Sequence, residues 1–151
     1  MFPLARHIAL RKNRSKTRTA ILPLSCIKNA FVLIDRTEAE YELAEEMAKE
    51  YFRSKGIEAI VLAPDRRDLD LLGRIKRKLR SGQQEDLLIS LYPVNRYEAE
   101  YEAKCSGARF KVGRYPLEKA IFDLIVSNRE NEFPKQWEVF ESMKDFLEKI
   151  K

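Results

Sequence analysis

The 151-residue chain has few of the residues on which common catalytic and structural sites depend. Its two cysteines, Cys26 and Cys105, are too few for a disulfide framework and are not spaced as a metal-ligand pair. We therefore predict free thiols in a reducing cytoplasm. The single histidine, His7, lies near the N-terminus, so we expect no histidine-dependent triad. A dyad with Cys105 would require the N-terminus to fold back onto that thiol.

Glycine and long apolar runs are also scarce. The five glycines form neither Gly-x-Gly-x-x-Gly nor Gly-x-x-x-x-Gly-Lys-Ser/Thr, which argues against a dinucleotide site or a P-loop. No uncharged run approaches the roughly 20 residues that span a bilayer, so we expect no membrane partner. We predict no cofactor and no bound metal.

Positive charge is concentrated at one end of the chain. Residues 1–34 contain seven Lys and Arg and no acid, whereas residues 35–151 contain 22 basic and 24 acidic side chains. We therefore divide the chain into a basic N-terminal arm, residues 1–28, and a nearly neutral domain, residues 29–151. A first stretch that is rich in Arg, contains Ser and Thr and lacks acids is also typical of an organellar presequence.

Short apolar runs alternate with amphipathic stretches from Ala30 onward. Continuous apolar runs predict buried strands at 30–35, 57–63, 86–92, 108–113 and 122–127. Alternation of strands with helices implies right-handed βαβ units. The sequence thus predicts an α/β fold, a Rossmann-like three-layer domain with a mostly parallel five-stranded sheet. The pattern does not determine the strand order, for which we favour 3-2-1-4-5.

Four amphipathic stretches predict the helices. Thr37 and Glu40 have the spacing of a capping box, and Gly56 suits the end of the helix that follows. A second helix is expected over residues 68–81, and a third from Asn95 to about residue 105. Pro134 suits the first turn of a last helix. The apolar side of that last helix contains Trp137, Phe140, Met143, Leu147 and Ile150.

Three predicted strands are followed by an acid or amide and then an arginine, at intervals of thirty residues. Because the carboxyl ends of parallel strands share one edge of the sheet, these side chains would face an anionic or hydroxyl-rich ligand. The alternative is that the acids and the amide cap the next helices while the arginines are solvated. With Arg114, which follows the fourth strand, the strand-end residues are Asp35, Arg36, Asp65, Arg66, Asn95, Arg96 and Arg114.

A second basic segment, residues 66–80, has seven basic side chains against Asp68 and Asp70. Asp65, Asp68 and Asp70 have oxygen ligands for Mg²⁺, but the arginines between them disfavour a metal. Together with the arm, the segment is typical of contacts to a phosphate backbone, and no interleaved aromatics indicate base stacking. The alternative is a solvated helix face and a disordered arm. The predicted nucleic-acid-binding residues are Arg11, Lys12, Arg14, Lys16, Arg18, Arg74, Arg77, Lys78 and Arg80.

Segments 86–91, 103–113 and 122–126 resemble a family of short bacterial proteins of unknown function, most specifically at Ala-Arg-Phe-Lys-Val-Gly, residues 108–113. The resemblance implies the fold and no activity. The chain is also similar, more faintly, to the N-terminal half of heptosyltransferase-type glycosyltransferases. The shared pattern is an apolar strand led by Asp, a helix, Ser-Gly-Ala, and then Arg, an apolar residue and Gly. The chain lacks their second, nucleotide-sugar domain and a glycine-rich loop after the first strand. This likeness therefore implies a shared scaffold without its catalytic half.

We therefore expect a non-catalytic binding protein that contacts an anionic partner, RNA or a ribonucleoprotein, through the arm and the basic segment. The alternative is a nucleotide or phosphosugar site, or a glycosyltransferase-like site, at the carboxyl ends of the strands. The apolar side of the last helix is a further candidate surface for a protein partner or a homodimer.

Overall fold

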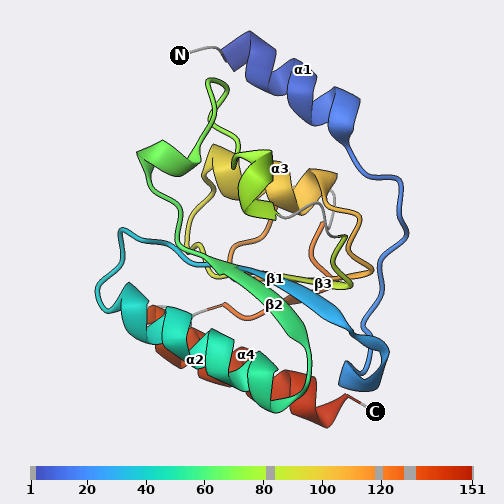
Figure 1. The fold of residues 1–151 in the computed structure, drawn as a ribbon, viewed down its shortest axis with the longest axis vertical. Coiled ribbons are helices and arrows are strands. Elements are labelled where there is room, and N and C mark those ends of the chain that lie inside the picture. The colour runs from blue at the N-terminus through green and yellow to red at the C-terminus, as the bar shows by residue number, and fades with distance from the viewer. Residues whose placement is uncertain (1–2, 81–83, 118–120, 128–131, 151) are drawn as a thin grey trace.

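The computed structural model describes residues 3–80, 84–117, 121–127 and 132–150. One parallel sheet runs through the centre of the molecule in the order β2-β1-β3-β4-β5 (Figure 1). The α/β, Rossmann-like architecture with a mostly parallel five-stranded sheet is confirmed. The strands are β1 (Asn29–Leu33), β2 (Glu58–Leu62), β3 (Leu87–Ser90), β4 (Phe110–Gly113) and β5 (Leu124–Ile125).

The strand order differs from the expected 3-2-1-4-5. β1 pairs with both β2 and β3, so that Ala30 lies opposite Ala59 on one side and Leu87 on the other. After β2 the chain therefore crosses back over β1 and adds β3 on the far side. The order reverses between β1 and β3, and ligands of doubly wound sheets bind at such switch points, outside the carboxyl ends of the strands.

Helices cover both faces of the sheet. α2 (Tyr41–Ser54) and α4 (Gln136–Lys149) lie together on one face, and α3 (Tyr97–Cys105) lies on the other with α1 (Pro3–Asn13) outside it (Figure 1). Successive β1 residues pack into opposite clusters, Val32 with the α2 and α4 side and Leu33 with the α3 side. Burial on both faces explains the uninterrupted apolar run. None of the helices in the described ranges has the length and apolarity to cross a membrane.

The prediction of a helix over residues 68–81 is wrong. The chain forms two short 3₁₀ turns, η2 (Arg66–Asp68) and η3 (Arg77–Arg80), joined by a loop. The Asp70 carboxylate accepts hydrogen bonds from the backbone N–H groups of Leu72 and Arg74, both at 2.9 Å. Gly73 between them has φ +85°. Such a side-chain turn satisfies the backbone locally and competes with a helix. We call residues 66–80 the basic loop.

The prediction of a capping box at Thr37 and Glu40 is also wrong. Thr37 instead donates its backbone N–H and its hydroxyl to the Asp35 carboxylate, at 3.0 and 2.7 Å. Glu40 has a left-handed backbone, φ 60°, and α2 begins at the next residue, Tyr41. Gly56 has φ +69° just after α2, so its predicted role at the end of this helix is confirmed.

Two further helix starts differ slightly from prediction. α3 begins at Tyr97, and Asn95 does not cap it, because the Asn95 side chain donates to Glu100 at 3.3 Å. Pro134 precedes α4, which begins at Gln136. Shifts of one or two residues are expected because capping signals locate helix ends only approximately.

The N-terminal arm packs against the domain. α1 lies across α3, where Arg6 donates to the Leu72 carbonyl at 2.9 Å and lies over the Tyr97 ring, 4.8 Å from its centroid. Farther along, the Ser15 N–H donates to the Lys104 carbonyl at 3.1 Å. The described part of the arm is therefore an ordered layer over α3 and not a disordered tail.

The start of α4 is joined to the end of β1 by the side chain of Gln136, which is fully buried. Its Oε1 accepts from the Asp35 backbone N–H at 2.7 Å, and its Nε2 donates to the Asp35 carbonyl at 3.1 Å. One side-chain amide thus contacts both backbone groups of Asp35 and is the partner of its N–H, while the Asp35 carbonyl also accepts from the Glu38 N–H at 3.2 Å.

We predict that Gln136→Leu, which keeps similar volume, lowers the free energy of unfolding by about 1–3 kcal/mol. The reason is that the buried Asp35 N–H is left unpaired, whereas the Asp35 carbonyl still accepts from the Glu38 N–H at 3.2 Å. Urea denaturation measures this. Ser142→Ala, on the exposed side of the same helix, is the control and is expected within about 0.5 kcal/mol of the unmodified protein. Equal effects of the two substitutions would contradict the role of Gln136.

Candidate functional site

The switch point between β1 and β3 holds a hydrogen-bond network around Asp35, whose side chain is 1% exposed. Besides Thr37, its Oδ1 contacts Arg96 Nη1 at 3.3 Å, and Arg96 Nη2 donates to the Thr37 hydroxyl at 3.0 Å. The other carboxylate oxygen, Oδ2, is buried without a hydrogen-bond partner. The structure thus brings together Asp35 and Arg96, two of the strand-end residues.

Arg114 lies next to this network, but most of its donors are used inside the protein. Its Nη1 donates to Glu38 and to the Leu91 carbonyl, and its Nη2 donates to the Pro134 carbonyl at 3.1 Å. Burial raises the pKa of Glu38, against the lowering effect of Arg114. Arg114 therefore ties the loop after β1 to the start of α4.

The other strand-end residues do not join Asp35. Arg36 donates to the Ala63 carbonyl at 2.7 Å and lies over the Tyr41 ring, and Asp65 caps η2 by accepting from the Arg67 N–H at 2.9 Å. Asn95 contacts Glu100 and Arg66 is exposed. Capping of η2 by Asp65 agrees with the alternative interpretation, in which the acids at the strand ends cap the helices that follow. Within the described ranges, no three His, Cys, Asp or Glu side chains are placed to hold a metal ion.

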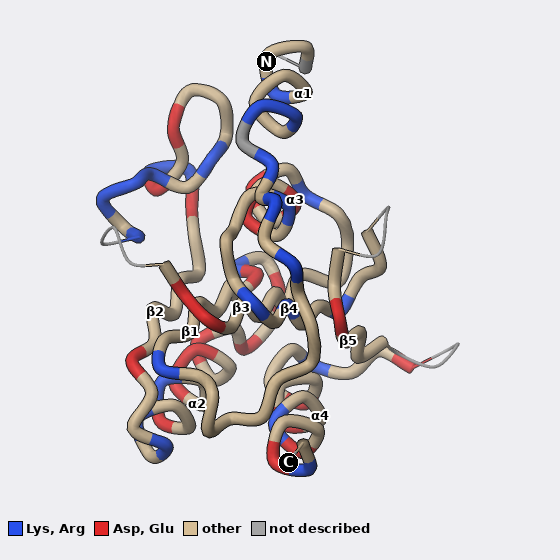
Figure 2. The backbone as a smooth tube through the Cα atoms, turned by 90° about the vertical axis from the view of Figure 1, so that its right-hand side faces the viewer, with Lys and Arg blue, Asp and Glu red and all other residues tan. Residues whose placement is uncertain are grey.

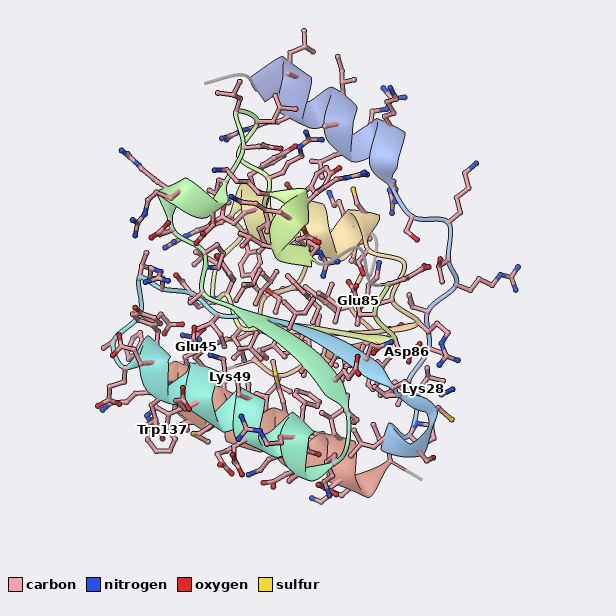
Figure 3. All side chains as sticks on the ribbon, in the orientation of Figure 1. Lys28, Glu45, Lys49, Glu85, Asp86 and Trp137 are labelled. Atoms are coloured by element: carbon pink, nitrogen blue, oxygen red, sulfur yellow. The ribbon has the colours of Figure 1, made fainter. Side chains whose placement is uncertain are left out.

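An open groove of about 790 Å³ lies on the α3 side of the sheet, between the basic loop and the second half of α3. Arg74, Arg77 and Arg80 line it from the loop, and Tyr101 and Glu102 from α3. Figure 3 shows another lining residue, Glu85, between α3 and the sheet. Charged groups of both signs therefore meet in this groove.

Three of these lining residues form a buried charge cluster. Arg80 Nη2 lies 2.6 Å from Glu85 Oε1 and 3.3 Å from Glu102 Oε2, and its guanidinium lies over the Phe31 ring, 3.7 Å from the centroid. Burial raises the pKa of Glu102 to about 7; Arg80 lowers it and Glu85 raises it. Glu102 therefore changes charge in the neutral range.

The nine predicted nucleic-acid-binding residues fall into two groups. Arg74 is paired with Asp70 at 2.9 Å and lies over the Tyr101 ring, and Arg80 belongs to the buried cluster. The other seven are exposed and form no ion pair within the described part of the chain. We call them the basic face: Arg11, Lys12, Arg14, Lys16, Arg18, Arg77 and Lys78.

The two segments that supply the basic face are held to the same side of the domain. Both lie on the α3 side of the sheet: Figure 2 shows the arm passing in front of α3, and Figure 1 shows the basic loop on the other side of this helix from the extended part of the arm. Arg6 fastens α1 to the loop through Leu72, and Ser15 fastens the arm to Lys104, next to the groove residue Cys105. The groove therefore lies between the basic loop and the part of α3 that the arm contacts.

Sequence reasoning missed the aromatic and acidic residues around this groove. Tyr97 and Tyr101 lie between Arg6 and Arg74 in space, although no aromatic interrupts either basic segment in the sequence. Their four-residue spacing, on one side of a helix, was the available signal. The signal for Glu102 was an acid three residues after Ala99, on the buried side of the same helix.

The apolar side of α4, a predicted partner surface, faces inward. Val139, Phe140, Met143 and Leu147 are buried in the core, and Phe146 is 48% exposed. A protein partner or homodimer at this helix stays a prediction.

We predict that Glu102 makes the protein less stable as pH rises. The folded state holds this proton with a pKa of about 7, against 4.5 for an ordinary glutamate, so the folded protein binds more protons than the unfolded chain between these values. The free energy of unfolding therefore falls by about 2–3 kcal/mol from pH 5 to pH 8 on account of Glu102.

Glu102→Gln is expected to abolish this contribution to the fall in the free energy of unfolding, because glutamine does not titrate. Urea unfolding of both proteins at pH 5 and pH 8 measures it. Glu100→Gln removes an acid that pairs with Lys104 at 3.1 Å on the same helix, and it is expected to leave the fall intact. Identical pH profiles for the unmodified protein and Glu102→Gln would refute the assignment.

Comparison with known proteins matches residues 5–150 to one family model, described as a family of unknown function (DUF6913). No curated protein and no solved structure matches the chain. The resemblance to a family of unknown function is confirmed, while the fainter likeness to heptosyltransferases stays a prediction.

Proposed function

The chain belongs to the DUF6913 family of unknown function, and we propose from its own residues that it is a non-catalytic protein that binds RNA, free or within a ribonucleoprotein. The observation that supports this most is the basic face, seven exposed cations without acidic partners among the described residues. Arg6 joins α1 to the basic loop, and Ser15 joins the arm to α3, so both segments that supply these cations are fixed to the domain.

An anionic polymer suits this surface better than a small anion. The seven cations follow the end of a helix, an extended segment and a 3₁₀ turn, so no single small ligand spans them. Side chains on such an irregular path can follow a flexible, single-stranded backbone. Lys and Arg side chains that neutralise phosphates also release the counterions condensed along a nucleic acid, a gain in entropy that a small anion does not offer.

The cysteines support a cytoplasmic location for this function. Cys26 and Cys105 are both free, and Cys26 is exposed. An exposed free thiol is stable in a reducing compartment.

We predict a steep dependence of RNA affinity on salt. Each neutralised phosphate of a single strand contributes about −0.7 to the slope of log affinity against log salt, so seven contacts give a slope of about −5. Fluorescence anisotropy of labelled single-stranded RNA in 50–300 mM KCl measures it. No binding at 50 mM, or binding that salt leaves unchanged, would refute the proposal.

The combined substitution of Arg14, Lys16 and Arg18 by Gln is expected to flatten this slope by about 2, since three contacts are lost. The control removes three cations from α2 and α4, on the opposite face of the sheet (Figure 1), by Lys49→Gln, Arg53→Gln and Lys144→Gln. Both triple variants have the same net charge, so the control tests position. A control that flattens the slope equally would show that net charge alone attracts the RNA.

A second candidate function is a small-ligand site at the switch point, favoured by one observation. Asp35 Oδ2 is buried without a partner, and Arg96 beside it is 37% exposed. A nucleotide or phosphosugar offers a hydroxyl to the carboxylate and a phosphate to the guanidinium.

Thermal-shift screening against nucleotides and phosphosugars tests this second function. A ligand that binds only the folded protein raises the Tm, by an amount that grows with its concentration relative to the Kd. We expect the shift to disappear in Arg96→Ala and to persist in Arg36→Ala, whose guanidinium contacts the Ala63 carbonyl and Tyr41 instead. A screen without any shift would eliminate this function.

A further inference from the structure

We propose that the groove between the basic loop and α3 binds a phosphate group of the RNA, and that Glu102 takes up one proton when it does. This inference rests on the proposed function and adds to it a specific site and its regulation. It assigns to one groove a role distinct from the general attraction of the basic face.

The groove has donors for a phosphate on both sides. Arg77 lines it and forms no ion pair within the described ranges. Arg80 Nη1 is buried without a hydrogen-bond partner. The Gln84 amide packs against the backbone of Gly107, where a Cβ would clash with Gln84 Nε2. Guanidinium and amide N–H groups are the donors that phosphate oxygens accept from.

The net charge of the side chains that line the groove determines when the groove can bind an anion. Arg74, Arg77 and Arg80 carry three positive charges, and Asp70, Glu85 and Glu102 carry three negative charges when all are ionised. The fully ionised groove is thus neutral overall, and a phosphate that approaches Arg80 meets two carboxylates already in contact with it. Neutralising one carboxylate leaves a net positive groove.

Glu102 is the carboxylate suited to accept that proton. It faces Arg80 from η3 and Glu85 from the segment before β3, and Cys105 lies near it on its own helix. Burial raises the pKa of Cys105 to about 11, so this thiol stays protonated through neutral pH. Lys111 of β4 interacts with Glu85 and Cys105 from the sheet side and donates to the Ala103 carbonyl at 2.7 Å.

Proton and phosphate then favour each other's binding. A bound phosphate places negative charge near Glu102 and raises its affinity for the proton, and by linkage the protonated site binds phosphate more tightly. With a pKa of about 7, Glu102 is about 90% protonated at pH 6 and about 9% at pH 8. The RNA affinity is therefore expected to be about tenfold higher at pH 6.

The test is anisotropy titration of single-stranded RNA at pH 6 and pH 8 and constant salt. The RNA lacks terminal phosphates, because a phosphate monoester itself titrates near pH 6. Histidines change charge between pH 5 and pH 8, so exposed His7 on α1 is replaced by Gln in every protein tested.

In that background we expect the tenfold pH effect with the native groove. Glu102→Gln is expected to bind equally at both pH values, with the affinity that the native groove has at pH 6. Glu100→Gln, on the same helix, is the control and should retain the tenfold effect. A Glu102→Gln protein that keeps the pH effect overturns the inference.

Calorimetry supplies a second measurement that needs no groove variant. Titration at pH 8 in two buffers of different ionisation enthalpy should reveal uptake of about 0.9 proton per bound RNA, and none for Glu102→Gln. RNA binding without proton uptake and without the pH effect overturns the groove site and leaves the proposed function standing. Failure to bind RNA at low salt overturns both.

Discussion

The paired hydrogen bonds between the Gln136 side chain and the Asp35 backbone join the last helix to the first strand. They fix the backbone of Asp35 just past the end of β1, and from there its carboxylate reaches Thr37 and Arg96. The same join positions the residues before α4, so that the Pro134 carbonyl accepts from Arg114. The geometry of the switch point therefore depends on the contact between the end of β1 and the start of α4.

The basic loop is held by charged groups that are partly or mostly buried. Asp70 and Arg74 stabilise its bend, and Arg80 anchors its end between Glu85, Glu102 and the Phe31 ring. Removing ions from water is costly, so a buried guanidinium needs such neighbours. Of the four predicted nucleic-acid-binding cations in this loop, Arg74 and Arg80 thus stabilise its structure, whereas Arg77 and Lys78 are exposed and available to a ligand.

Patterns within one element were predictable, and contacts between distant elements were not. The apolar run of β1 and Gly56 after α2 follow from local rules, and both were predicted correctly. The loop at residues 66–80 has helical spacing of Leu72, Ile75 and Leu79, but Gly73 and the Asp70 turn prevent a helix. Local propensity is weak where a side chain offers the backbone another partner.

The candidate site was predictable only in part for the same reason. That Asp35 and Arg96 meet follows from parallel strands sharing an edge. Which acids lie nearby in three dimensions decides that Asn95 contacts Glu100. It also decides that the Arg80 side chain is only 16% exposed while Arg77 is exposed. One-dimensional charge counts cannot separate paired from unpaired cations.

The docking of the arm on α3 has a consequence for how the chain folds during synthesis. Arg6 is made well before its partners Leu72 and Tyr97, which follow 66 and 91 positions later in the chain. Ser15 likewise forms its hydrogen bond with Lys104, which is made later. Contacts of such long sequence separation close late in folding. The arm is therefore expected to dock only after the basic loop and α3 have been made, although it is itself translated before both of them.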